Sequence, residues 1–429
     1  MYPRNLVMAC LHLFLGLTFG WFGWTHALHA QLLEGDRIVF CGDSITDQKT
    51  YTRLVMDYFA LRHPGTKLVF FNVGITGSTA GGWKKDGIQK HVLPLKPTLV
   101  TLCLGMNDGG YRAYEPKTGD TYEANLMALI TDIKAGGARV ALLTPGAIDD
   151  DTIPPRFAKG VYNDTLARLA KRVETIGARE NIPVFNIHNL MLEIQTRAKT
   201  QTPAFTMIPD GVHPGEVGAT AMAYGLLKVL GPIRPAASLR LDASAKTTET
   251  SLCTVQNLNV TDDHLTFTRT DHALPTFLPK DAIVALQPHT AILEELNEYR
   301  LAVTNLKQDT WKLQVEDALA GVFTSEDLAR GVNLGNMPGP WQLLGGKVDR
   351  LAAEASHVYD VVFHGLSQRH FPQAADSASP QLRELAAEIE TARVAYIQKV
   401  IALYEADEWK RGMVPASERT WRWTFTRMP

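Results

Sequence analysis

The chain has 429 residues and a formal net charge of −2, and 45% of its residues are hydrophobic while 21% are charged. This composition excludes an intrinsically disordered chain, and the near-neutral charge without a basic, aromatic-rich stripe excludes nucleic acid as an expected partner. Because the net charge is close to zero, we expect a neutral or small substrate. The length exceeds what one hydrophobic core usually covers, so we expect two domains.

The first thirty residues, 1–30, differ from the rest of the chain. Arg4 supplies a positive start, an apolar stretch without charge follows over residues 5–24, and the segment ends in the small residue Ala30. This pattern predicts a signal peptide cleaved near Ala30 and a secreted or periplasmic protein without stable membrane association. The alternative is a retained anchor, because the apolar run approaches the ~20 residues that a membrane helix needs. His12 inside the run favours cleavage.

Three cysteines remain after the leader, namely Cys41, Cys103 and Cys253. An odd number leaves at least one thiol unpaired or bonded to another chain. Cys41 and Cys103 lie in apolar, strand-like runs, where a lone cysteine is usually a small buried hydrophobe. We therefore expect the hydrophobic core, and not a disulfide framework, to hold the fold together.

Between residues 37 and 231, short apolar runs alternate with amphipathic patterns such as the helical spacing of residues 126–133. Five runs are nearly continuous in apolar residues, as strands covered on both faces should be: RIVFC, KLVFFNV, TLVTLCL, RVALLT and IPVFNI. Alternating strands and helices predict a parallel sheet with helices on both faces. We assign residues 31–235 to this α/β domain, with its ligand crevice at the carboxyl ends of the strands.

After a proline-rich linker the pattern changes to period-two alternation. Residues 299–303 and 311–315 alternate on either side of NLKQDT, which predicts a β-hairpin. We therefore expect a small antiparallel β domain over residues 236–340. A helical C-terminal region over residues 341–429 should follow it.

The C-terminal region carries two further patterns. A long helix is predicted behind Pro380, with Leu382, Leu385, Ile389, Ala392, Tyr396 and Leu403 on one face. Near the end of the chain, Trp421, Trp423 and Phe425 alternate along a predicted strand. Such a stripe is able to stack on sugar rings, but packing against the β domain is the favoured interpretation.

Ser44 follows the first predicted strand directly, in the run GDSITD. A serine hydroxyl is a weak nucleophile, so it needs a neighbouring base, and the base needs an orienting group. Asp210 and His213 are three residues apart, a spacing that lets two side chains meet on one turn. The carboxylate can hold one imidazole nitrogen protonated while the other accepts the serine proton. Ser44, Asp210 and His213 are therefore the catalytic candidates.

Two further segments predict an oxyanion hole. Gly77 lies in a glycine-rich loop after the second strand, where a backbone N–H can approach a ligand closely, and Asn107 follows the third strand. With the N–H of Ser44 they provide three donors for one developing negative charge. The acidic run at residues 149–151 lacks the spacing of a calcium loop, so we interpret it as a solvated loop. We expect neither a cofactor nor a metal ion.

The blocks GDSITD, NVGITG, GMND and DGVHP, in this order, resemble those of the SGNH (GDSL-type) hydrolases. The Ser, Gly, Asn and His of that name fall here on Ser44, Gly77, Asn107 and His213. The resemblance covers roughly residues 36–231, with each block after a predicted strand or before a helix. It implies a flavodoxin-like, three-layer α/β fold and ester hydrolysis through an acyl-enzyme. The β domain and helices behind it also look like exported bacterial members with a C-terminal extension.

Other residues near these blocks are weaker candidates. Trp83, Tyr111 and Arg112 are candidates for the substrate pocket, although Trp83 also suits a core position and Arg112 a surface position. Asp43 and Asp108 flank the catalytic positions, where turn stabilisation competes with a role in the chemistry.

The predicted function is that of a serine esterase acting on a short-acyl ester carried by a carbohydrate. The preference for acetyl is implied by the resemblance, because many exported relatives with added β domains deacetylate polysaccharides. One alternative is a lipid or lysophospholipid acylhydrolase, which a long apolar acyl channel would distinguish. Another is a non-catalytic, carbohydrate-binding scaffold that retains the hydrolase fold.

Overall fold

The computed structural model describes residues 29–85, 87–157, 159–367, 379–405 and 419–428. The predicted signal peptide therefore lies outside the described residues except for its last two positions, His29 and Ala30. Ala30 is bound to the folded domain, since its N–H donates to the carbonyl of Val229 at 2.7 Å. Within this described part of the chain, no helix is both long and apolar enough to cross a membrane.

Five parallel strands form the sheet of the N-terminal half, in the order β2-β1-β3-β4-β5. The strands are β1 (Arg37–Gly42), β2 (Val69–Asn72), β3 (Leu99–Cys103), β4 (Arg139–Leu143) and β5 (Val184–Phe185). The predicted parallel sheet and its flavodoxin-like order are confirmed. The strand order reverses between β1 and β3, and ligands of open α/β sheets bind at the carboxyl ends of the strands beside such a reversal.

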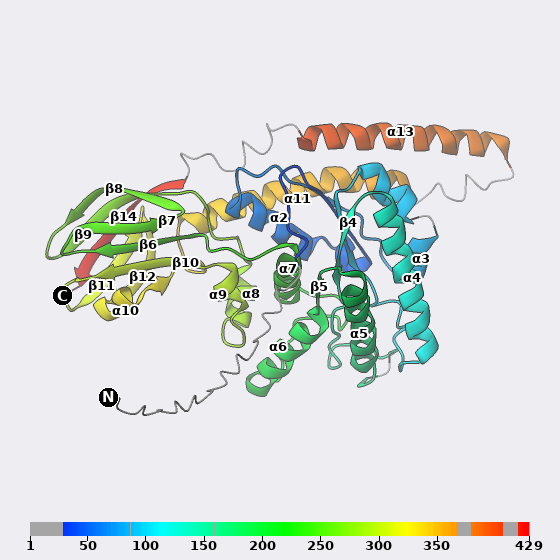
Figure 1. The fold of residues 1–429 in the computed structure, drawn as a ribbon. Helices are drawn as coiled ribbons and strands as arrows, with labels where there is room; N and C mark the ends of the chain where they lie inside the picture. The colour runs from blue at the N-terminus through cyan, green and yellow to red at the C-terminus, as the bar shows by residue number, and fades with distance from the viewer. Residues whose placement is uncertain (1–28, 86, 158, 368–378, 406–418, 429) are drawn as a thin grey trace, which may run out of the picture.

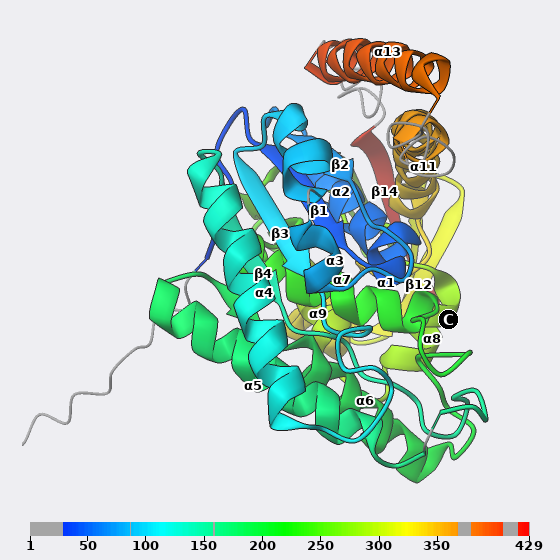
Figure 2. The same ribbon diagram turned by 90° about the vertical axis from the view of Figure 1, so that its right-hand side faces the viewer.

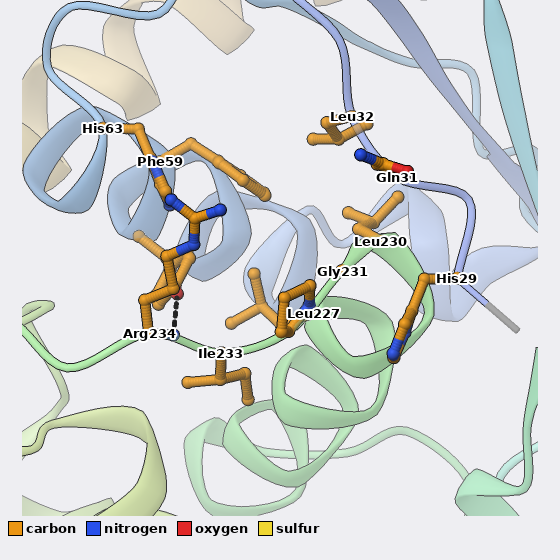
Figure 3. A pocket seen from close by; sticks show the side chains of 12 residues that line it. His29, Gln31, Leu32, Phe59, His63, Leu227, Leu230, Gly231, Ile233 and Arg234 are labelled. Carbon is orange, nitrogen blue, oxygen red and sulfur yellow. Dashed lines mark hydrogen bonds between the residues drawn. The ribbon is translucent and has the colours of Figure 1, made fainter. Parts of the chain in front are cut away.

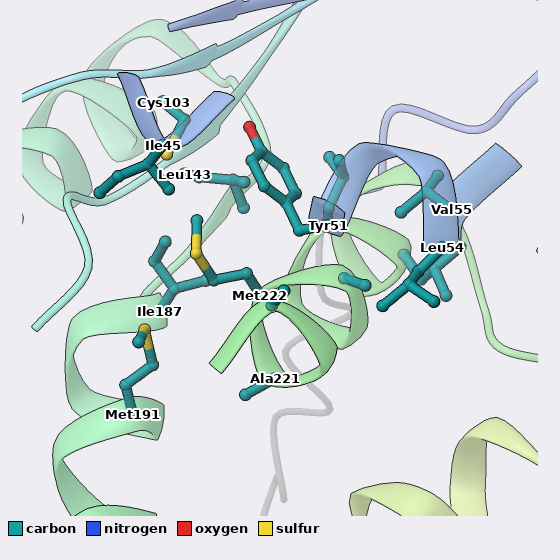
Figure 4. Packing of buried hydrophobic residues seen from close by; sticks show 14 of the residues in the cluster. Ile45, Tyr51, Leu54, Val55, Cys103, Leu143, Ile187, Met191, Ala221 and Met222 are labelled. Carbon is teal, nitrogen blue, oxygen red and sulfur yellow. The ribbon is translucent and has the colours of Figure 1, made fainter. Parts of the chain in front are cut away.

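Helices cover both faces of this sheet (Figure 1). The helices of this half are α1 (Ser44–Asp47), α2 (Thr50–Arg62), α3 (Ala80–Lys84), α4 (Pro116–Ala135), α5 (Tyr162–Glu180), α6 (Ile187–Gln201) and α7 (Glu216–Leu230), with short turns at Ile88–Val92 and Leu93–Leu95. Along β1, Ile38 and Phe40 join the core under α2, α6 and α7, while Val39 and Cys41 join the core under α3, α4 and α5. Successive strand side chains point to opposite faces, so a continuous apolar run serves both layers. Figure 4 shows part of the first core.

Two further sheets pack face to face in the C-terminal half. One has the order β13-β10-β6-β7 and the other β12-β11-β14-β9-β8. Their strands are β6 (Ala237–Asp242), β7 (Thr247–Ser251), β8 (Cys253–Val260), β9 (His264–Asp271), β10 (Tyr299–Thr304), β11 (Thr310–Val315), β12 (Ala318–Thr324), β13 (Val332–Asn333) and β14 (Thr420–Met428). Leu239 and Leu301 of the first sheet share one core with Leu313 and Trp423 of the second. The arrangement is a β-sandwich.

The structure corrects three expectations for this half. β10 and β11 do not form a hairpin, because β10 pairs with β6 and β13 while β11 pairs with β12 and β14. The sandwich is not purely antiparallel, because the β6–β10 pair is parallel. The predicted boundary at residue 340 divides the sandwich, because β14 lies at the centre of its second sheet. Trp421, Trp423 and Phe425 of β14 are buried in the sandwich core.

The C-terminal helices join the two halves. Short helices α8 (Lys280–Leu286), α9 (Ile292–Leu296) and α10 (Ser325–Arg330) precede the long helices α11 (Pro340–Ser367) and α13 (Pro380–Glu405). α11 leaves the sandwich and runs along the catalytic domain, with α13 beyond it in both views (Figures 1 and 2). Arg53 of α2 donates to Asp349 of α11 at 2.6 Å, and Lys49 lies 2.7 Å from Asp360. The helical region is thus packed on the catalytic domain.

Candidate active site

Close packing at the end of β1 presents Ser44 to the crevice. A Cβ atom on Gly42 would lie 2.0 Å from Oγ1 of Thr46 and 2.7 Å from the carbonyl oxygen of Cys103, so only glycine fits there. The next residue, Asp43, caps α1 by accepting the N–H of Ile45 at 3.0 Å. The chain therefore turns sharply from strand to helix, and Ser44 becomes the first helical residue.

Ser44, His213 and Asp210 form one hydrogen-bonded relay. Oγ of Ser44 lies 2.9 Å from Nε2 of His213, and Nδ1 of His213 lies 2.8 Å from Oδ2 of Asp210. Because a carboxylate accepts, Nδ1 carries the proton and Nε2 is left to accept one from the serine. Ser44 follows the carboxyl end of β1, and Asp210 and His213 lie in the loop before α7. Ser44 and His213 are 169 positions apart in the sequence.

The carboxylate of Asp210 is held in its ionised form. Partial burial acts to raise its pKa, but the backbone N–H and the imidazole of His213, together with the N–H of Val212, outweigh burial and lower the pKa. Oδ1 accepts the N–H groups of Val212 and His213 at 2.9 and 2.6 Å, which leaves Oδ2 for the imidazole. Local backbone geometry thus aims the acid at the histidine.

A buried ion pair supports the loop that carries Asp210. The N–H of Asp149 donates to the carbonyl of Gly211 at 3.1 Å, and a Cβ on Gly211 would lie 2.2 Å from Cα of Ile153. Asp149 is fully buried and accepts from Nζ of Lys199 at 2.6 Å. The interpretation of residues 149–151 as a solvated loop is therefore wrong for Asp149, whose Oδ1 accepts from Lys199 while its buried Oδ2 has no hydrogen-bond partner in the described chain.

Three candidate oxyanion donors lie on Ser44 and on two loops tied to its strand end, since the Ser78 hydroxyl donates to the carbonyl of Gly42 at 3.2 Å. The N–H groups of Ser44 and Gly77 donate to no described acceptor, and Asn107 uses Nδ2 for one bond, to the carbonyl of Ser78 at 2.9 Å. Gly77 has φ +75°, a left-handed conformation that favours glycine. Since an amide nitrogen has two hydrogens, Asn107 retains a second donor. The structure thus brings the loops of all four blocks together.

Two buried acids lie behind these loops. Burial raises the pKa of Asp43 to about 7, although the hydrogen bond from the N–H of Ile45 acts to lower it. The charge of Asp108 adds to the rise. Burial also raises the pKa of Asp108 to about 6. The N–H of Ala80, which donates to Oδ1 at 2.9 Å, acts to lower this pKa. Asp43 caps a helix and Asp108 fixes the loop before α3, so both support the site in the way expected from turn chemistry.

The three predicted pocket residues have different environments. Trp83 is fully buried, and its Nε1 donates to the carbonyl of Gly42 and to the Ser78 hydroxyl at 3.1 and 3.0 Å, so it supports the site from within the core. Tyr111 lies at the site, with its hydroxyl donating to Oδ1 of Asn107 at 3.1 Å. Arg112 is exposed and lines a neighbouring cavity.

Sequence reasoning missed several supporting residues. Asn72 ties the β2 loop to α1, donating to the carbonyl of Thr46 at 2.7 Å and accepting from the N–H of Gly74 at 2.9 Å. Its position in the run FFNVGITG, at a strand end, was the available signal. Phe157 and Tyr162 stack against Tyr111, and no local pattern in the sequence marks them.

Two cavities of about 360 Å3 each differ in their relation to the site. One is lined by Asp108, which follows Asn107 in the sequence, and by Arg112, but Ser44, Asn107 and His213 are not among its lining residues. The other is lined by the C-terminal ends of α2 and α7 and the segment before β1, including His63 and Arg234 (Figure 3). Helices run back from the carboxyl edge of a parallel sheet, so this second cavity lies at the edge opposite Ser44. It is not part of the candidate active site.

Comparisons with known proteins agree with this architecture. Residues 40–221 match the GDSL-like lipase/acylhydrolase family. No match was found among curated proteins. A gut microbial diltiazem-metabolizing enzyme of known structure is similar over 94% of this chain and 100% of its own, with TM-score 0.74 and 22% identity. An acetylxylan esterase from Geobacillus stearothermophilus is similar over 47% of this chain and 96% of its own, with TM-score 0.37 and 22% identity.

The likeness to the first of these structures extends the shared fold to the sandwich and the C-terminal helices. The family match spans the first three blocks and the loop of Asp210 and His213. Residues 40–221 are therefore similar to the GDSL-like lipase/acylhydrolase family, and the protein is a carboxylic ester hydrolase.

Proposed function

We propose that this enzyme is a serine esterase that uses Ser44 as its nucleophile and removes a short acyl group, acetyl in the simplest case, from a carbohydrate. The observation that carries the serine mechanism is the relay from Oγ of Ser44 through His213 to Asp210, with distances of 2.9 and 2.8 Å. Both are within the hydrogen-bond reach that a nucleophile and its base require.

In the first half-reaction Oγ of Ser44 attacks the ester carbonyl carbon while Nε2 of His213 takes the hydroxyl proton. The carbonyl oxygen becomes an oxyanion, which the N–H groups of Ser44 and Gly77 and the amide of Asn107 stabilise. The intermediate collapses by breaking the bond to the alcohol oxygen. His213 returns its proton to that oxygen, and the acyl group stays on Ser44.

In the second half-reaction a water molecule attacks the acyl-enzyme. His213 accepts a proton from the water, and the same three donors stabilise the second oxyanion. Collapse breaks the bond between the acyl carbon and Oγ of Ser44 and releases the carboxylic acid, and His213 returns its proton to Oγ. Asp210 stays ionised throughout and stabilises the imidazolium, which fits a carboxyl group whose pKa is lowered.

The cavity lined by Asp108 and Arg112 is the candidate site for a hydroxyl-rich alcohol. It is lined by charged and hydroxyl side chains, namely Asp108, Arg112, Glu115, Lys117, Thr118 and Thr121. Such groups hydrogen-bond to sugar hydroxyls, whereas a fatty alcohol or lipid tail would leave them without partners. This favours an ester of a polar alcohol, such as a carbohydrate, over an ester of a fatty alcohol.

The test is hydrolysis of p-nitrophenyl acetate, butyrate and octanoate, followed by acetate release from an acetylated oligosaccharide. We expect kcat/KM to fall with acyl length and acetate to be released from the sugar. A preference for octanoate would support a lipid acylhydrolase instead. No hydrolysis of any ester would support the scaffold alternative.

Ser44→Ala tests the nucleophile, with Ser244→Ala as the matched control on an exposed turn after β6. We expect Ser44→Ala to abolish hydrolysis without loss of fold, while Ser244→Ala keeps the rate of the parent enzyme. Because no metal enters the proposed reaction, dialysis against EDTA should leave the rate unchanged. A loss of activity restored by zinc or calcium would overturn the mechanism.

The proposal includes export of the enzyme. Its support is the leader-like sequence of residues 1–30, with a positive start, an apolar stretch and a small residue at its end. The intact mass of the protein recovered from a bacterial secretion host should correspond to cleavage near Ala30. Recovery of the full-length chain in the membrane fraction would indicate a retained anchor.

A further inference from the structure

Asn107 is held on two sides, by groups from two different segments of the chain. Its Nδ2 donates to the carbonyl of Ser78 at 2.9 Å, and its Oδ1 accepts from the hydroxyl of Tyr111 at 3.1 Å. Turning the amide over would place Oδ1 against the Ser78 carbonyl, where two acceptors would repel each other. Only one orientation of the amide satisfies both neighbours.

This orientation decides whether Asn107 can serve as an oxyanion donor. One hydrogen of Nδ2 is committed to Ser78, so the second is the only one left for a substrate oxygen. A rotation of the amide plane would move that hydrogen away from the reacting carbonyl. The Tyr111 hydroxyl, which fixes the amide plane of Asn107 on its Oδ1 side, therefore acts on the transition state through Asn107.

The chain conformation that brings Tyr111 back over Asn107 is unusual. Gly110 and Tyr111 have φ values of +69° and +56°, and the left-handed region is uncommon for a bulky residue such as tyrosine. The N–H of Gly110 donates to the carbonyl of Asn107 at 3.1 Å, which closes the turn. The surrounding structure must offset the strain at Tyr111.

An aromatic stack supplies that support. The Tyr111 ring stacks on Phe157 with 4.3 Å between ring centroids and on Tyr162 with 4.9 Å, at interplanar angles of 19° and 26°. Tyr162 is itself fixed, because its hydroxyl donates to the carbonyl of Met106. Stacked rings at these separations stabilise one another beyond the area that they bury.

The phenol remains a donor at every pH at which a histidine base operates. Burial raises the pKa of Tyr111 to about 12, and the negative charges of Asp43 and Asp210 act in the same direction, while Arg156 opposes them. The hydroxyl proton therefore stays in place to be donated to Asn107.

We propose that Tyr111 is a positioning residue, which locks the Asn107 amide so that its free hydrogen faces the oxyanion. The inference rests on the proposed serine esterase mechanism and adds to it a residue with no part in the family's four blocks. Tyr111 acts through Asn107 and not by contact with the substrate, so its effect must disappear when Asn107 is absent.

The test is a double-mutant cycle with Tyr111→Phe and Asn107→Ala. Tyr111→Phe keeps the ring in the stack and removes only the hydroxyl. We expect kcat to fall about threefold to tenfold, the effect of one neutral hydrogen bond, with KM nearly unchanged. The factor should be the same for acetate and butyrate esters. Asn107→Ala should lower kcat on the order of 10²–10³-fold.

The decisive value is the rate of the double variant Tyr111→Phe/Asn107→Ala. We expect it to equal the rate of Asn107→Ala alone, because no amide remains to be positioned. A further loss by the same factor as in the parent enzyme, or an unchanged kcat in Tyr111→Phe alone, would overturn the proposal. An unchanged kcat in Asn107→Ala would instead contradict the oxyanion role on which the proposal rests.

Tyr224→Phe is the matched control. It removes a hydroxyl that donates to Glu295 at 2.6 Å, on α7 and outside the catalytic loops. We expect it to leave kcat and KM unchanged, and thermal melts of all variants will verify the fold. If Tyr111→Phe does not fold, Phe157→Leu keeps the hydroxyl but weakens the stack, and it should lower kcat only when Asn107 is present.

Discussion

Two pairs of ionisable residues in this chain differ strongly in burial. The side chains of Asp210 and His213 are 58% and 32% exposed, whereas those of Arg269 and Asp271 in the β-sandwich are both 0% exposed. Both pairs are close in sequence, with hydrogen bonds of 2.8 Å. The first pair stands at a crevice next to a serine, and the second lies between aromatic rings.

The surroundings of the second pair show what a buried charge requires. The guanidinium of Arg269 lies 4.4 Å from the ring centroid of Tyr299 and 5.1 Å from that of Trp423, and the Tyr299 hydroxyl donates to Asp271 at 2.7 Å. Aromatic faces and one carboxylate replace water around the cation. Sequence spacing alone therefore does not distinguish a catalytic pair from a structural one; the neighbours do.

Loss of the catalytic pair should have the largest effect on rate. We expect His213→Ala to lower turnover on the order of 10⁶-fold and Asp210→Asn on the order of 10⁴-fold, because the first removes the base and the second misdirects it. Turnover of the parent enzyme should fall as the pH is lowered and the base is protonated. Rate–pH profiles of the three proteins give the measurement. An acid limb that survives in His213→Ala would exclude His213 as the base.

Loss of the structural pair should change stability and not rate. Arg269→Met leaves Asp271 buried without its cation, which should lower the free energy of unfolding by about 3–5 kcal/mol. Urea denaturation measures the loss, and kcat of the remaining folded enzyme should be unchanged. The double variant Arg269→Met/Asp271→Leu should recover much of the stability. A fall in kcat of the folded protein would show that the sandwich core affects the active site.

Asp43 combines features of the two pairs, because it is buried like Asp271 and adjoins the catalytic serine. Its pKa is about 7 when folded against the ordinary 3.8, so the folded state holds a proton that the unfolded state releases. The stability due to this proton is complete below pH 3.8 and is lost as the pH rises through 7. Over that window the loss is on the order of 4 kcal/mol, at about 1.4 kcal/mol for each pKa unit.

Asp43→Asn should remove this part of the pH dependence and still cap α1 through its amide oxygen. Urea denaturation between pH 4 and 8 gives the comparison, with Glu216→Gln, an exposed acid at the start of α7, as the control. Parallel stability curves for Asp43→Asn and the parent would contradict a buried, protonated Asp43.

The sequence could predict the parts of the site that depend on local rules. A glycine at a strand end, an acid three residues before a histidine and an asparagine after a buried strand each determine a local geometry. The parallel topology then brings the three strand ends to one edge. Ser44 and Asn107 therefore follow the ends of β1 and β3, and Ser44 meets His213 and Asp210 of the loop before α7.

Contacts between distant loops could not be predicted in this way. The stack of Tyr111 on Phe157 joins residues 46 positions apart, and nothing in the spacing of either residue indicates the other. Likewise, alternation along residues 299–303 and 311–315 reports that one face of each strand is buried. It does not report the pairing partner, so the predicted hairpin was wrong although both strands exist.

The same limit applies to α13. Its predicted apolar face includes Leu382, Tyr396 and Leu403, which are about half exposed in the structure. The helix packs instead through Ala386, Arg393, Ile397, Val400 and Ile401, all of them buried. The apolar residues of α13 span a wide arc, and periodicity alone does not say which part of the arc faces the protein.

The smallest effect should come from Lys228 and Glu295, which are 2.6 Å apart and 33% and 41% exposed. Their exposure is close to that of Asp210 and His213, but no nucleophile adjoins them. Such a half-exposed pair contributes less than about 1 kcal/mol, and salt screens it. Lys228→Met should therefore shift the urea midpoint only slightly, less so at high salt, and leave kcat unchanged. A loss of turnover would mean that the charge of Lys228, at the end of α7, affects catalysis without contact with Ser44. The difference between a catalytic and a structural pair would then not be set by the immediate neighbours of each pair alone.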